Sequence, residues 1–129
     1  MANTLNDDLQ LETYKSMISV SVEVFKYLAL LNGGAAAGML AIFDRLMKVI
    51  PICPLKFALM SFVAGLLFDG MAVGCSYWTQ YTLFNEGFER MRKGRHIAFL
   101  VFATVLCIFS LLAFCIGAAV GALSAHAIT

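Results

Sequence analysis

Long stretches without charged side chains divide the chain into three blocks. They cover residues 27–43, residues 57–85 with Asp69 as the single exception, and residues 97–129. A transmembrane helix needs about 20 apolar residues to cross a hydrocarbon core of about 30 Å. The second and third blocks are long enough, and the first becomes so when Lys26 or Arg45 extends toward the headgroups. The pattern therefore predicts three membrane spans, over residues 27–48, 57–85 and 97–125.

The segment before the first span has the periodicity of an amphipathic helix. Its apolar positions recur every three or four residues; they are Tyr14, Met17, Ile18, Val22 and Phe25. Asn6 is placed to cap this helix, with Asp7 and Asp8 in its first turn. We predict a cytoplasmic amphipathic helix over residues 7–26. Because no helix breaker intervenes, it is expected to continue into the first span as one helix ending near Lys48, about 60 Å long.

An apolar register with coiled-coil spacing runs through this arm and the first span. Its a and d positions are Leu11, Tyr14, Ile18, Ser21, Phe25, Leu28, Asn32, Ala35, Met39, Ile42, Leu46 and Val49. Only Ser21 and Asn32 are polar among them, so the register favours self-association. The alternative is an arm that lies flat on the inner leaflet, against which its few lysines count.

Basic residues set the expected orientation. Two lysines precede the first span and four cations follow the second, so that three spans bring all six to one side; they are Lys15, Lys26, Arg90, Arg92, Lys93 and Arg95. The other side has only Arg45, Lys48 and Lys56. The positive-inside rule then places the N-terminus in the cytoplasm and the C-terminus outside.

Aromatic and proline residues fit the same topology. Trp78, with Tyr77 and Tyr81, is expected in the aromatic belt at the cytoplasmic interface. Pro51 and Pro54 are expected in the outer turn between the first two spans.

A secretory signal peptide is the alternative interpretation of the first block, because three alanines at residues 35–37 imitate a cleavage site. Acidic residues precede this block, and its purely apolar run, Leu28 to Leu31, is too short for such a signal. We therefore expect the first block to be a span.

Composition agrees with a membrane protein. Hydrophobic residues make up 61% of the 129 residues, charged residues 13%, and the mean hydropathy is +0.86; soluble domains are about 25% charged. The net charge of +1 favours no partner by itself. The predicted fold is a single all-α membrane domain over residues 1–129, forming a homo-oligomeric bundle.

The chain carries no motif of a known catalytic or cofactor site, such as HExxH, GxSxG or a P-loop. The four cysteines, with no CxxC among them, are expected to be small hydrophobic side chains and not disulfides or metal ligands. We therefore expect no catalytic residue, no cofactor and no metal, and predict that the protein is not an enzyme.

Each predicted span contains two glycines four residues apart. They are Gly34 and Gly38, Gly70 and Gly74, and Gly117 and Gly121. This spacing lets helix backbones approach closely, within one chain or between copies. Gly33 joins the first pair in a segment rich in glycine and alanine, which is a poor helix former and a candidate gate.

Two polar residues interrupt the spans. Asp69 lies near the middle of the second span, where a charge costs at least about 2.5 kcal/mol and therefore marks function or a polar partner. Three interpretations stay open: a proton or cation site, a ring of carboxylates in an oligomeric pore, and a hydrogen bond to Asn32 or another polar group. Asn32 itself is either an interhelical hydrogen-bonding residue or a polar constriction of a pore.

The charged cluster after the second span also has two interpretations. It is a topology determinant or, through Arg90, Arg92, Lys93 and Arg95, a site for an anionic ligand. Lys15 and Lys26, on the same side, are expected to assist in binding such a ligand.

The segment from Phe25 to Phe43, with its L-N-G-G-A-A run at residues 31–36, resembles small bacterial three-span membrane proteins with a cytoplasmic helix. The layout is similar to the membrane effectors of Hailong-type anti-phage systems. That resemblance implies a tetrameric channel in the bacterial inner membrane, held closed by DNA oligomers that a partner nucleotidyltransferase makes. It also implies ion leakage and growth arrest as the output, with the basic cytoplasmic residues as the oligonucleotide site.

The leading functional hypothesis is a homo-oligomeric channel, gated from the cytoplasmic side through the first helix. The second is a small proton- or cation-coupled exporter with Asp69 as the exchange site. The third is a holin or an accessory membrane subunit.

Overall fold

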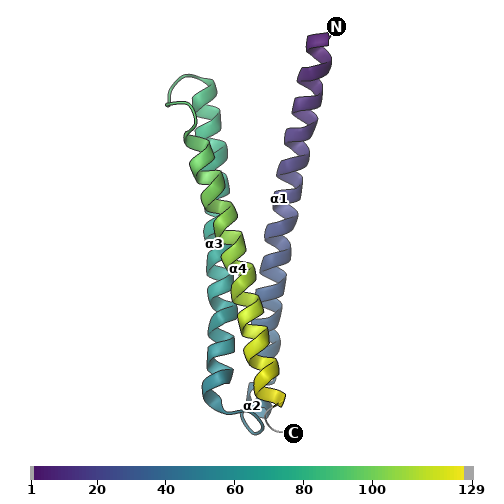
Figure 1. Ribbon diagram of the computed structural model, residues 1–129, viewed down its shortest axis with the longest axis vertical. Coiled ribbons are helices and arrows are strands. Elements are labelled where there is room, and N and C mark those ends of the chain that lie inside the picture. The colour runs from purple at the N-terminus through teal and green to yellow at the C-terminus, as the bar shows by residue number, and fades with distance from the viewer. Residues whose placement is uncertain (1, 127–129) are drawn as a thin grey trace.

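The chain is an all-helical hairpin with a third long helix beside it. The computed structural model describes the backbone of residues 2–126, which contain α1 (Ala2–Ala41), α2 (Phe43–Leu46), α3 (Ile52–Gly87) and α4 (Arg95–His126) and no strand (Figure 1). Three segments are long and apolar enough to cross a membrane: Leu11–Ala41, Ile52–Gly87 and Arg95–Ser124. The predicted all-α fold with three span-like helices is confirmed. The side chains of residues 1–7, 10 and 125–129 lie outside the described residues. The backbone of α1 is already helical from Ala2, so the prediction that Asn6 caps a helix beginning at residue 7 is wrong.

The first helix is continuous through the predicted arm and span, but it ends earlier than predicted. α1 stops at Ala41, and Ile42 has φ −117° and ψ 15°, outside the helical region. The reversal between α1 and α3 takes up residues 42–51, with α2 inside it. Pro51 (φ −55°, ψ 142°) lies just before α3, whereas Pro54 lies within its first turn, where a missing N–H costs no hydrogen bond.

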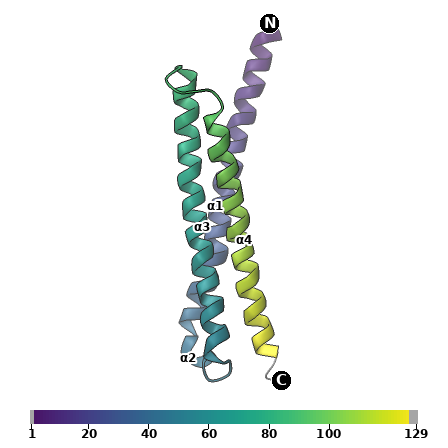
Figure 2. The ribbon, with the colours of Figure 1, turned by 60° about the vertical axis from the view of Figure 1, so that its left-hand side comes forward.

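α3 and α4 form an antiparallel hairpin that is packed along its whole length (Figures 1 and 2). Aromatic pairs occur at three levels, Phe62–Phe114 and Phe68–Phe109 with ring centroids 5.8 and 5.7 Å apart, and Trp78–Phe99 at 6.4 Å. Close approach of the backbones depends on Gly117, where a Cβ would stand 2.8 Å from the Phe62 ring and 3.1 Å from the carbonyl oxygen of Ala58. The hairpin is therefore the fixed part of the fold.

α1 packs against this hairpin with only one half. In its C-terminal half, Leu28, Asn32 and Ala36 are buried, and Ala36 belongs to the core cluster with Ala58 and Phe62. The N-terminal half diverges from the hairpin, so that the ribbon has the outline of a V (Figures 1 and 2). Exposed apolar side chains mark this half, among them Leu9, Leu11, Met17 and Val20. α1 is thus anchored at one end of the bundle and free at the other.

The two ends of the bundle differ in what they carry. The start of α1 and the α3–α4 turn (residues 88–94) lie at one end, called the basic end below; α2 and the end of α4 lie at the other, called the opposite end (Figure 1). Arg90, Arg92 and Lys93 of the turn lie at the basic end, whereas Lys26 lies past the midpoint of α1, toward the opposite end.

The predicted cytoplasmic arm lies beside the hairpin rather than beyond it. Tyr14 of α1 and Leu83 of α3 line the same crevice, so they lie at about the same level of the bundle. Tyr14 of α1 therefore lies beside the last turns of α3. Trp78 and Phe57 are 21 residues apart on α3, about 30 Å along a helix, which matches a hydrocarbon core bounded by the aromatic belt.

The a/d register of the first helix contacts the chain's own hairpin. Leu28 and Asn32 are buried against it, and Ala35 and Met39 pack on the core cluster. The register positions nearer the basic end, Tyr14, Ile18, Ser21 and Phe25, line the crevice between α1 and the hairpin. Much of the pattern that favoured self-association is therefore used within one chain.

Candidate functional site

Asn32 is fully buried where α1 meets α3 and α4. Its Nδ2 donates to the hydroxyl oxygen of Ser110 at 3.1 Å and lies 3.3 Å from the Ser110 carbonyl oxygen and 3.2 Å from that of Leu28. In an apolar medium a hydrogen bond between two helices favours one position of the helices relative to each other. The amide thus fixes the register of α1 against α4, in agreement with the interhelical interpretation of this residue.

A missing side chain on α3 makes room for this amide. A Cβ on Gly65 would overlap Oδ1 of Asn32. Gly65 is itself buried, so the backbone of α3 forms the wall against which the carboxamide lies. Asn32, Gly65 and Ser110 together make a polar contact shared by all three long helices.

Asp69 lies one helical turn from Gly65, on the same face of α3. Its side chain is 5% exposed, and its Oδ1 has no hydrogen-bond partner. Oδ1 of Asn32 is likewise buried and unpartnered. Among the described residues these are the two buried side-chain atoms left without a partner. The Asn32 amide hydrogens go to Leu28 and Ser110, so the hydrogen bond to Asp69 that the sequence left open is not formed.

The glycine pairs divide between inner and outer faces. Gly117 is buried between α3 and α4. Gly33 packs on Leu66, since a Cβ added to Gly33 would lie 3.6 Å from the Leu66 side chain. A Cβ at each of the other five would meet no atom within 4 Å; these are Gly34, Gly38, Gly70, Gly74 and Gly121. The outward pairs are therefore free for contact with lipid or another helix, while the close contact within the chain depends on Gly65 and Gly117.

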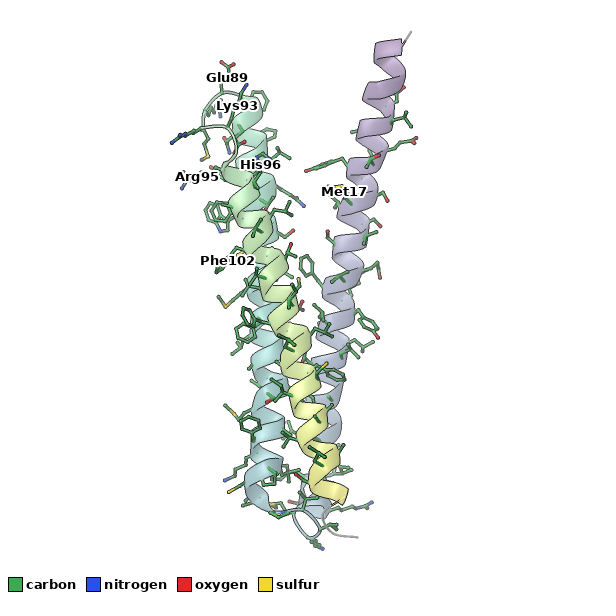
Figure 3. The ribbon with its side chains drawn as sticks, viewed as in Figure 1. Met17, Glu89, Lys93, Arg95, His96 and Phe102 are labelled. Atoms are coloured by element: carbon green, nitrogen blue, oxygen red, sulfur yellow. The ribbon has the colours of Figure 1, made fainter. Side chains whose placement is uncertain are left out.

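A crevice separates the free half of α1 from the hairpin. Its outer part, about 340 Å³, reaches from Tyr14 and His96 down to Ser76. Its inner part, about 190 Å³, continues past Ser76 to Thr104 and Cys107. Figure 3 shows Met17 on α1 facing the hairpin across this opening, with His96 near the top of the hairpin.

The predicted anionic-ligand residues are partly brought together. Arg90, Arg92, Lys93 and Arg95 are all exposed on or next to the α3–α4 turn, where Figure 3 labels Lys93 and Arg95. Lys15 and Lys26 lie on α1 and do not line this crevice; Lys26 is paired with Glu23 at 2.8 Å and lines a separate groove with Leu111 of α4. The structure therefore groups the four cations on or next to the turn but not the two lysines of α1.

Glu86 holds the α3–α4 turn closed. Its Oε2 accepts the backbone N–H of Gly94 at 2.9 Å and lies 2.7 Å from Nδ1 of His96, and its Oε1 accepts the backbone N–H of His96 at 3.0 Å. The carboxylate therefore caps the start of α4 from the end of α3. Gly94, with φ +92°, supplies the left-handed backbone that a side chain rarely adopts.

The charge of Glu86 is stabilised by this arrangement. Glu86 lies two turns past Trp78, outside the apolar part of α3. Burial acts to raise the pKa of Glu86, but the hydrogen bonds from the Gly94 N–H and from the side chain and N–H of His96, together with the charge of His96, lower the pKa from 4.5 to about 2. The turn is thus fastened by an ionised carboxylate near neutral pH.

Sequence reasoning missed three residues of these contacts. Gly65 lies four positions after Ser61, another small residue, but has no glycine four residues away. Ser110 stands alone in an apolar run and has no distinguishing spacing. Glu86 directly follows the second predicted span, and its capping role depends on the fold of residues 88–96.

Two of the four cysteines, Cys53 and Cys115, are exposed, and Cys75 and Cys107 are half-buried. Cys53, Cys75, Cys107 and Cys115 are free thiols. Among the described residues no group of three histidine, cysteine or acidic side chains is placed to hold a metal ion.

Three span-like helices, enclosing buried polar residues in their middle, define the chain as an α-helical membrane protein with several spans. Comparisons with protein-family models, with curated proteins and with solved structures find no match.

Proposed function

We propose that the chain is a homo-oligomeric membrane channel for protons or small cations, in which Asp69 and Asn32 belong to the ion pathway and α1 closes it. The observation that carries this proposal is the pair of buried, unpartnered oxygen atoms, Oδ1 of Asn32 beside Gly65 and Oδ1 of Asp69 one helical turn further along α3. An unpartnered carboxyl oxygen in an apolar interior is costly unless the site serves an ion or a proton. Movement of α1 away from the hairpin would open both oxygens to water.

The unequal packing of the three helices supports α1 as the moving part. α3 and α4 are joined by aromatic pairs along their length and by the Glu86 cap at the turn. α1 is buried only in its C-terminal half, and its other half stands apart (Figure 1). A change at the basic end is therefore transmitted more readily through α1 than through the hairpin.

Assembly of several copies is part of the proposal. Three helices enclose no wide pore, so conduction needs further helices around an axis. The outward glycines of α1 and α3, Gly34 with Gly38 and Gly70 with Gly74, meet no atom of their own chain and allow a second helix to approach closely. Four copies is the number that the resemblance to the Hailong-type effectors suggests.

The trigger and the biological setting rest on the resemblance and on the cationic turn. We place the basic end in the cytoplasm of a bacterial inner membrane, by the positive-inside rule. The exposed cations Arg90, Arg92, Lys93 and Arg95 support an anionic ligand there, such as a nucleotide or a DNA oligomer made by a partner nucleotidyltransferase. Membrane depolarisation and growth arrest in anti-phage defence would be the output.

The test combines assembly with conduction. The purified chain in mild detergent or nanodiscs is expected to be an oligomer, and in liposomes to dissipate a cation or proton gradient. Asp69→Asn keeps the size of the side chain and is expected to lower the flux by about tenfold or more without changing the oligomer. Asp44→Asn, at an exposed position of α2, is the matched control and should leave the flux unchanged. A monomeric protein, or an Asp69→Asn variant that conducts as the wild type does, would overturn the proposal.

One observation favours a second candidate, a small cation-coupled exporter. Asp69 is buried within the helices of a single chain rather than on an outward face. A carboxylate in that place serves as an exchange site without any pore around an oligomer axis. Transport of a second solute that requires a cation gradient, and that Asp69→Asn abolishes, would support the exporter over the channel.

A further inference from the structure

The crevice between α1 and the hairpin is continuous from the basic end to the middle of the bundle. Its outer and inner parts share four lining residues, Ser21, Phe25, Ser76 and Leu100. Tyr14, Leu83 and His96 line the outer part, and Cys107 the inner part. Cys107 is 11 positions past His96 on α4, which places it about 16 Å deeper along the helix axis.

The hairpin wall of this crevice carries several polar side chains within a mostly apolar lining. Ser76, Thr79 and Gln80 of α3 line the outer part, and Thr104 and Cys107 of α4 the inner part. The side chain of Thr79 donates to the carbonyl oxygen of Cys75 and that of Thr104 to Leu100, so their hydroxyl oxygens keep accepting capacity. Such a wall offers hydrogen bonds to water that lipid chains cannot use.

The inner end of the crevice lies at the level of Asp69. The antiparallel pairing of Phe68 with Phe109 aligns Asp69 with residues 107–109 of α4. Asp69 and Cys107, the deepest lining residue of the crevice on α4, therefore lie at about the same level of the hairpin.

Below this level the helices are closely packed. Ala36, Ala58 and Phe62 form the buried cluster, with Met39, Phe114 and Val120 against it. The cluster lies between Asp69 and the opposite end of the bundle, and its residues are apolar. The crevice is therefore open to one side of the membrane only.

From this arrangement we infer that the crevice is an aqueous vestibule, through which water and small cations reach Asp69 from the basic end and not from the opposite end. Cys107 lies where the vestibule meets Asp69. The inference rests on the proposed function, which gives Asp69 its role in the ion pathway. It adds the end of the bundle from which Asp69 is reached and the residues that line the vestibule. It needs no second copy of the chain, because both walls belong to one chain.

The native cysteines supply the experiment. A variant that keeps only Cys107 (Cys53→Ser, Cys75→Ala, Cys115→Ala) is reconstituted into sealed liposomes of known orientation and treated with a membrane-impermeant, positively charged methanethiosulfonate. We expect modification from the basic-end face to be at least about tenfold faster than from the opposite face, since only a thiol in water forms the reactive thiolate. A variant that keeps only Cys115, exposed on the outer surface of α4, is the matched control and should react slowly from both faces.

A second measurement links the vestibule to Asp69. The positively charged reagent is expected to modify Cys107 several-fold faster than a negatively charged one of similar size, because an ionised carboxylate concentrates cations nearby. Asp69→Asn should remove this preference while Cys107 stays reactive. The same reagents on the wild-type chain, with modified peptides identified by mass spectrometry, give the answer if the cysteine-depleted variant does not fold.

Two results would overturn the inference. One is a Cys107 thiol that is unreactive from both faces in liposomes but reactive in denaturing detergent. The other is modification that is equally fast from the opposite face. Neither result depends on conduction. The vestibule is therefore tested by thiol modification, and the channel is tested separately by the ion flux and the oligomer size.

Discussion

The Glu86 carboxylate of α3 contacts His96 of α4 twice, through Nδ1 at 2.7 Å and through the backbone N–H at 3.0 Å. A single acidic side chain thus joins the end of α3 to the start of α4. The same carboxylate accepts the N–H of Gly94, so that three contacts close the turn. The cationic residues Arg90, Arg92 and Lys93 belong to the turn that these contacts close.

The first prediction concerns this cap and its pH dependence. The pKa of Glu86 in the fold is lowered from 4.5 to about 2, so its contribution to stability is present above pH 4.5 and is lost as the pH falls through about 2. Glu86→Gln is expected to lower the melting temperature in detergent near neutral pH, and the difference from the wild type should shrink toward about pH 2. Glu89→Gln, on the exposed part of the same turn, is the control and should melt as the wild type does. A Glu86→Gln deficit that is constant with pH would contradict the prediction.

The second prediction concerns the seat of Asn32. Gly65→Ala places a methyl group where Oδ1 of Asn32 lies, and α1 must move away from α3 to accommodate it. We expect the free energy of unfolding to fall by about 1–3 kcal/mol and α1 to be proteolysed faster. Gly70→Ala, on the open face of the same helix, should change neither quantity. Equal proteolysis of the two variants would show that the contact is loose.

The third prediction concerns the Asn32–Ser110 hydrogen bond. Ser110→Ala removes the hydroxyl acceptor at 3.1 Å but leaves the carbonyl oxygens of Leu28 and Ser110 for the same amide. The free energy of unfolding, measured by denaturant titration, is therefore expected to fall by only about 0.6 kcal/mol, as for other hydrogen bonds between membrane helices. Asn32→Leu should cost more than Ser110→Ala, because the larger branched side chain must also fit against Gly65. The prediction fails if Ser110→Ala is the more damaging change.

The fourth prediction concerns the contact of α3 with α4. Gly117→Ala brings a Cβ to 2.8 Å from the Phe62 ring and 3.1 Å from the Ala58 carbonyl oxygen. The ring can turn aside but the backbone oxygen cannot, so we expect about 1–3 kcal/mol of destabilisation. Gly121→Ala, one turn further on the same helix, meets no atom and is the control. Phe62→Leu should rescue Gly117→Ala only in part, and full rescue would show that the backbone contact is unimportant.

The three long helices were predictable because their signal is additive along the chain. A span is recognised from some 20 apolar positions together, so the glycines of the first block weakened the prediction without reversing it. The end of α1 at Ala41 was not predictable in the same way. It depends on where the chain must turn to bring α3 alongside, which is a property of the packed bundle rather than of residues 42–48.

The candidate site was predictable in its members but not in its contacts. Asn32 and Asp69 stand out as polar residues in apolar spans, whichever way they face. Their partners are a glycine and a serine, residues so common in membrane helices that only the fold distinguishes Gly65 and Ser110 from the rest. The heptad register illustrates the same limit, because its apolar stripe fits a second copy and the chain's own hairpin equally well.

The position of the Asn32–Gly65 contact along α1 has a mechanical consequence. Thirty residues of α1 separate Ala2 from Asn32, about 45 Å of helix, whereas nine residues separate Asn32 from Ala41. α1 can thus rotate about the buried amide, with a long N-terminal part on one side of it and a short C-terminal part on the other. A sideways displacement of the N-terminal end by several ångströms rotates the helix by only a few degrees. The polar atoms beside the amide are then exposed gradually, and the C-terminal part of α1 moves little.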